Sequence, residues 1–125
     1  MPTILVVDDS PTAVKLIAGA LTDAGFTVHT ATDGEQALTV AEETAPDVVV
    51  LDIILPKQNG YEVCRRLKHN DRTAHARIVL LTSKTHAADR QWGLRQGADA
   101  YLTKPVGPEQ LLHCIDHLLH NTSAL

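Results

Sequence analysis

The sequence is poor in cysteine and has no excess of positive charge, and both features exclude classes of function. Cys64 and Cys114 stand far apart, outside any CxxC or Cys/His metal-binding spacing, so we expect two free thiols in a reducing compartment. The formal net charge is -4, with 11 Lys and Arg against 15 Asp and Glu. The chain therefore lacks the cationic surface that holds phosphate backbones, and we expect no nucleic-acid partner.

Long hydrophobic runs are also absent. No stretch reaches the length of a membrane span, and the apolar segment 4–7 lacks the basic flank and cleavage site of a signal peptide. We therefore expect a cytoplasmic protein without membrane insertion. The 125 residues, 44% of them hydrophobic, suit one domain with one core, so we expect residues 1–125 to form a single domain.

Short β-branched or aliphatic runs alternate along the chain with segments of helical period. The predicted strands cover residues 4–7, 27–30, 47–51, 77–81 and 100–103, and the predicted helices cover residues 10–24, 34–44, 60–69, 86–96 and 108–120. Ser10 and Pro11 are typical of a helix start, and Gly25 is typical of a stop. Five such units predict an α/β fold, a flavodoxin-like (βα)5 doubly wound parallel sheet with strand order 2-1-3-4-5.

Polar residues fall at the carboxyl ends of four predicted strands: Asp8 and Asp9, Asp52, Thr82, and Lys104. In an open parallel sheet these ends meet at one edge, at the topological switch where ligands bind. Three carboxylates there repel one another unless a cation lies among them, and an all-oxygen set suits Mg²⁺. Asp52, alone on the middle strand, is the candidate nucleophile toward a phosphoryl group, whose charge Thr82 and Lys104 would stabilise.

Each of these residues has a simpler interpretation when taken alone. Asp8 and Asp9 would then be an N-capping pair for the first helix, and Asp52 a loop carboxylate. The combination with Lys104 favours the phosphoryl site.

The residues at these strand ends resemble the signature of the CheY-like receiver family of response regulators, and the resemblance runs from about residue 3 to residue 119. The residues that carry it are Asp8-Asp9, Asp52, Thr82 and Lys104-Pro105. It implies a single receiver domain with no output domain, which accepts a phosphoryl group from a histidine kinase as an aspartyl phosphate. It also implies a downstream protein target in a two-component phosphorelay.

The resemblance implies a role for each site residue. Asp52 would be the phosphoacceptor, and Thr82 and Lys104 would bind phosphate. The implied ligands of Mg²⁺ are Asp9, Asp52 and the backbone carbonyl of Ile54, with Asp8 acting through a bound water. A cis peptide between Lys104 and Pro105 is implied as well.

Activation in the family resembles a two-position switch, in which Thr82 moves toward the phosphoryl group and the aromatic Tyr101 rotates inward. The face of the last helix-strand-helix unit would then change shape for its target. The alternative for Tyr101 is an ordinary half-buried ring.

Two positions depart from the family pattern, because Ile54 and Lys84 stand where family members border the water that attacks the acyl phosphate. We hypothesise that the apolar Ile54 hinders this water and lengthens the lifetime of the phosphorylated state.

The segment around Trp92 is similar to stand-alone regulators of type IV pilus chemosensory systems, which control twitching motility; flagellar switching and a phosphorelay are the alternatives. Trp92 itself is expected to pack on a neighbouring helix rather than form a partner contact.

His113, His117 and His120 share one helix face, for which a solvated surface is favoured over a metal site. A monomer or weak dimer is expected.

Other classes of function remain for the same site. A dehalogenase-type phosphatase would need a second aspartate two residues after the nucleophile as its general acid/base. Ile54 occupies that position, so we expect no enzyme turnover. A phosphorylation-independent protein-binding module would tolerate a degraded site, whereas every acidic, hydroxyl and lysine position is occupied here.

Overall fold

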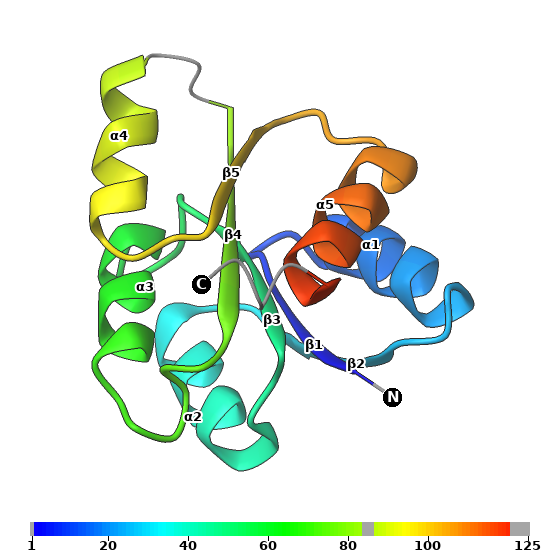
Figure 1. Cartoon of the computed structure of the whole chain (residues 1–125), viewed down its shortest axis with the longest axis horizontal. Helices are drawn as coiled ribbons and strands as arrows, with labels where there is room; N and C mark the ends of the chain where they lie inside the picture. The colour runs from blue at the N-terminus through cyan, green and yellow to red at the C-terminus, as the bar shows by residue number, and fades with distance from the viewer. Residues whose placement is uncertain (1, 84–86, 121–125) are drawn as a thin grey trace.

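The computed structural model describes residues 2–83 and 87–120 and shows one five-stranded parallel sheet between two layers of helices (Figure 1). The elements in chain order are β1 (Thr3–Val7), α1 (Pro11–Asp23), β2 (Thr27–Ala31), α2 (Gly34–Thr44), β3 (Val48–Asp52), α3 (Gly60–Lys68), β4 (Arg77–Thr82), α4 (Ala87–Arg95), β5 (Ala100–Thr103) and α5 (Pro108–His120). The strand order is β2-β1-β3-β4-β5, which confirms the predicted doubly wound fold.

Half of the element boundaries differ from the sequence-based expectation, each by one residue, and two of the differences matter for the site. β3 begins at Val48 instead of residue 47 and extends to Asp52, because Asp52 stays in parallel register with Leu81 of β4. β4 likewise ends at Thr82, opposite Thr103 of β5. Both polar residues therefore end their strands and take their positions from the sheet. The predicted helix 86–96 is α4, and residue 86 lies outside the described residues.

The core consists of two apolar clusters, one on each face of the sheet. Because neighbouring residues of a strand point to opposite faces, the continuous apolar runs of the central strands supply both clusters. Leu5 and Val49 face the cluster that includes Val63 of α3, whereas Ile4 faces the cluster that includes Ile115 of α5. In Figure 1, α2, α3 and α4 accordingly lie on one side of the sheet and α1 and α5 on the other.

The start of α1 follows the predicted capping pattern. The Ser10 side chain accepts a hydrogen bond from the Ala13 N–H at 3.3 Å, and Pro11 takes the first helical position. Asp8 accepts from the Ser10 N–H at 3.0 Å. The N-cap is therefore Ser10, not the Asp8-Asp9 pair that the simpler interpretation would have used, because the first aspartate points back toward the strand ends.

Among the residues described, no helix has both the length and the apolar character needed to cross a bilayer.

Candidate functional site: an acidic pocket at the carboxyl edge of the sheet

Three aspartates meet where β1 and β3 end. Asp8 and Asp9 follow β1, and Asp52 is the last residue of β3, next to β1 in the sheet. One carboxylate oxygen of each lies within 4.8 Å of the others. Asp8 and Asp52 are 2% and 6% exposed, whereas Asp9 is open to solvent. The pocket thus combines two buried carboxylates with one at its mouth.

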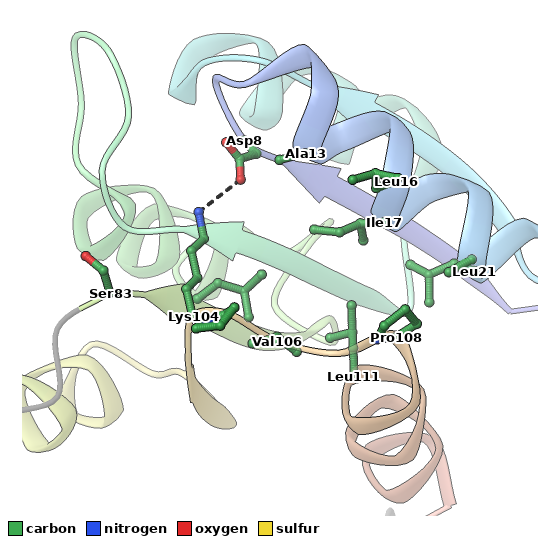
Figure 2. Close-up of a pocket in the computed structure, with 13 residues that line it drawn as sticks. Asp8, Ala13, Leu16, Ile17, Leu21, Ser83, Lys104, Val106, Pro108 and Leu111 are labelled. Carbon is green, nitrogen blue, oxygen red and sulfur yellow. Dashed lines mark hydrogen bonds and ion pairs between the residues drawn. The ribbon is translucent and has the colours of Figure 1, made fainter.

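Lys104 brings a positive charge into this pocket from the end of β5. Its Nζ lies 3.2 Å from Asp8 Oδ2 and 3.1 Å from Asp52 Oδ2. The contact with Asp8 is drawn in Figure 2. The backbone N–H of Lys104 donates to Thr82 O at 2.6 Å, and the peptide bond to Pro105 is cis, as the resemblance implied. Side chains from the ends of β1, β3 and β5 therefore converge, as the sequence predicted, and Thr82 is joined to Lys104 through its backbone carbonyl.

The electrostatics of the pocket favour an added cation. Burial raises the pKa of Asp52, and the hydrogen bond and charge of Lys104 offset this rise only in part, while the charge of Asp8 adds to it. Burial lowers the pKa of Lys104, but its bonds to Asp52 and Asp8 outweigh that effect and raise the pKa overall. Lys104 therefore stays cationic, yet one ammonium faces three carboxylates. This surplus of negative oxygen ligands is the donor set that suits Mg²⁺.

The loop after Asp52 is fixed closely against the end of β3. The Gly60 N–H donates to Ile53 O at 2.7 Å, and a Cβ on Gly60 would lie 2.5 Å from the carbonyl oxygen of Asp52. The Ile54 N–H points to Asp52 Oδ1 at 3.4 Å. The side chain of Ile54 is 60% exposed, so an apolar group stands at the surface two residues after the candidate acceptor.

The candidate switch residues are both buried. Thr82 is 1% exposed at the end of β4, and Tyr101 is 9% exposed on β5. Tyr101 is therefore more deeply buried than the half-buried ring considered as the alternative to a switch residue. The burial arises because α4 comes close at Gly93, where an added Cβ would lie 3.2 Å from Tyr101 Cδ2. Lys84, the second candidate for tuning the phosphorylated lifetime, lies outside the described residues.

A largely apolar groove of about 640 Å³ runs from the acidic pocket between α1 and α5 (Figure 2). Asp8 and Lys104 line one end, and Leu16, Ile17 and Leu111 line its flanks. Leu16 is 71% exposed. The sequence did not predict this groove, although Leu16 was a usable signal, because this leucine lies outside the apolar stripe that α1 turns toward the sheet.

Trp92 both packs on a neighbouring helix and is exposed at the surface, although the sequence suggested these as alternatives. Its ring meets the ring of Tyr61 on α3 edge to face, with centroids 6.5 Å apart, so it does pack on a neighbouring helix. It is also 52% exposed.

The structure shows a doubly wound α/β domain with an acidic pocket at the carboxyl edge of its sheet, and comparison with known proteins gives the family. Residues 4–116 match the response regulator receiver domain, and the chain belongs to this family. Receiver domains of two-component systems take a phosphoryl group from a histidine kinase, bind Mg²⁺ at an acidic pocket and act on downstream targets.

Two relatives and one solved structure illustrate what the chain is similar to. The chain is 40% identical to Protein PilH of Pseudomonas aeruginosa over 119 residues, covering 95% of this chain and 98% of PilH. It is 38% identical over 125 residues to the DNA-binding dual master transcriptional regulator RpaA of Synechocystis. The match covers the whole of this chain but only 52% of the length of RpaA. The chemotaxis response regulator CheY4 of Vibrio cholerae superposes with a TM-score of 0.89 at 33% identity, covering 94% of this chain and 98% of CheY4.

Proposed function

We propose that Asp52 accepts a phosphoryl group from a histidine kinase and that the chain then signals to a protein target through α4, β5 and α5. The observation that carries this proposal is the pair of contacts from Lys104 Nζ to Asp8 and Asp52. A buried carboxylate beside a cationic side chain is an arrangement that suits phosphoryl transfer, because positioning and charge stabilisation supply most of the catalysis.

The chain's own residues divide the work of the transfer. An Asp52 carboxylate oxygen attacks phosphorus, a P–O bond forms, and the P–N bond to the kinase imidazole breaks. Lys104 leaves its ion pairs with the carboxylates and pairs with phosphoryl oxygens. The Thr82 hydroxyl donates a hydrogen bond to a further phosphoryl oxygen. Lys104, whose Nζ lies 3.1 Å from Asp52 Oδ2, opposes the rise in the pKa of Asp52 that burial causes and so favours the ionised acceptor.

The proposed ligands for Mg²⁺ are Asp9, Asp52 and the backbone carbonyl of Ile54, with Asp8 acting through water. When bound, the ion offsets the negative charge of the phosphoryl oxygens. The cluster of three carboxylates supports this assignment.

The proposed output is a change at Tyr101. Movement of Thr82 toward the phosphoryl group frees space beside the Tyr101 ring, and the contact of α4 at Gly93 transmits the ring's new position. The chain works as a stoichiometric switch in this scheme and not as an enzyme that turns over a substrate.

The similarity to PilH, together with the segment around Trp92, supports a place in a type IV pilus chemosensory system that controls twitching motility. Flagellar switching and a phosphorelay remain the alternatives. The competing function is a protein-binding module that works without phosphorylation.

The test is intact mass after incubation with Mg²⁺ and acetyl phosphate. We expect one added phosphoryl group on wild type, none on Asp52→Asn, and none when EDTA removes the metal. Asp71→Asn is the matched control, because Asp71 is an exposed aspartate outside the pocket and should leave the adduct unchanged. An adduct that persists in Asp52→Asn would refute the assignment of the acceptor. A lack of adduct in wild type, with beryllofluoride also failing to bind, would favour the phosphorylation-independent module.

A further inference from the structure

From its middle to its C-terminal end, helix α5 carries four exposed polar side chains that take no part in the proposed phosphoryl transfer. His113, Asp116, His117 and His120 surround a surface hollow of about 250 Å³ and form its whole lining. The opposite side of the same helix is anchored, because Leu111 and Ile115 are buried in the core. The four side chains therefore lie on the outward side of a helix whose opposite side is packed in the core.

The spacing divides the four side chains into two pairs. His120 Nδ1 lies 3.2 Å from Asp116 Oδ1 and 2.9 Å from Asp116 O, so these two residues are engaged with each other. His113 and His117 stand one turn apart, and residues at this spacing have Cβ atoms about 5–6 Å apart on the same face. Two imidazoles so placed can turn their ring nitrogens toward one ion.

We propose that His113 and His117 form a two-imidazole chelate for a transition-metal ion such as Ni²⁺, Cu²⁺ or Zn²⁺. Imidazole nitrogen prefers these ions, whereas Mg²⁺ prefers oxygen ligands, so the two metal sites of the chain select different ions. Within the described residues, only Asp8, Asp9 and Asp52 bring three ligand atoms together. The α5 site therefore supplies two protein ligands and leaves the other positions to water.

The test is a titration of the untagged protein with NiCl₂, monitored by isothermal titration calorimetry. Excess MgCl₂ is present throughout, so that Mg²⁺ occupies the acidic pocket. We expect one Ni²⁺ per chain, and a loss of affinity of at least about tenfold in both His113→Gln and His117→Gln, since even outer-shell changes cost that much at metal sites. Glutamine suits an exposed helical position, and circular dichroism verifies that each variant is folded.

Two controls separate this site from others. His75→Gln removes an exposed imidazole elsewhere and should bind Ni²⁺ like wild type, and so should Asp9→Asn. An equal loss in His75→Gln, a loss in Asp9→Asn, or unchanged binding in His117→Gln would each overturn the proposal.

Discussion

At the scale of single residues, Ile54 places an exposed apolar side chain beside the candidate phosphoacceptor. It is 60% exposed, and its N–H points to Asp52 Oδ1. An apolar group there offers no hydrogen bond to a water that approaches the phosphoryl group, whereas an amide would orient that water.

We therefore predict that Ile54→Asn loses its phosphoryl group severalfold faster than wild type. The measurement follows intact mass over time after the phosphodonor has been removed. Leu94→Asn is the control, since it replaces another exposed apolar side chain that belongs to α4. If wild type loses the group as fast as Ile54→Asn, the role given to Ile54 is wrong.

The two thiols should differ in reactivity. Burial raises the pKa of Cys64 to about 12, and its side chain is fully buried, with Sγ 3.5 Å from Gln96 O. Burial also raises the pKa of Cys114, but this side chain is partly exposed. The thiolate is the reactive form, so both the raised pKa and the burial of Cys64 slow its reaction with added reagents.

We predict that iodoacetamide modifies native protein at Cys114 well before Cys64, and that both react together in denaturant. Peptide mapping by mass spectrometry measures the two rates, and Cys114→Ala isolates the slower one. Labelling of Cys64 at the rate of Cys114 in the native protein would contradict this prediction.

At the scale of elements, Gly60 sets how closely the loop after β3 approaches the strand. A Cβ there would lie 2.5 Å from the backbone carbonyl oxygen of Asp52, and a backbone atom has little freedom to give way. We predict that Gly60→Ala lowers the free energy of unfolding by about 1–3 kcal/mol, as overpacking does. Urea denaturation measures the effect.

The matched control is Gly19→Ala in α1, because nothing lies within 4 Å of a Cβ at that position. Here alanine should raise the free energy of unfolding by about 0.5–1 kcal/mol through its better helix propensity. If Gly60→Ala also raised the free energy of unfolding, helix propensity, and not the contact with Asp52, would decide the result at Gly60.

Elements are also the scale at which the sequence predicted most. Parallel strands place their carboxyl ends at one edge, so the positions of Asp8, Asp52 and Lys104 follow from chain order alone. The burial of Tyr101 and the groove beside Leu16 depend instead on how closely one helix approaches another element. Hydrophobic period predicts which face a helix buries, but not the gap left between two helices.

At the scale of the whole molecule, folding must bring carboxylates together that the unfolded chain keeps apart. Asp8, Asp9 and Asp52 converge, and within residues 2–83 and 87–120 the cation that pairs with Asp8 and Asp52 is Lys104, in a chain whose net charge is already -4. A divalent cation that binds this cluster binds the folded state and not the unfolded one. It therefore stabilises the fold in proportion to the logarithm of its concentration.

We predict that Mg²⁺ at a hundred times its dissociation constant adds about 2.7 kcal/mol to the free energy of unfolding. For a domain of this size, that corresponds to a rise in Tm on the order of 10 °C. Thermal denaturation in MgCl₂, compared with NaCl of equal ionic strength, separates site binding from general screening, which both salts provide. Asp9→Asn should lose most of the rise, whereas Asp71→Asn should keep it. An equal rise in NaCl, or a full rise in Asp9→Asn, would mean that the acidic pocket does not couple the metal to folding.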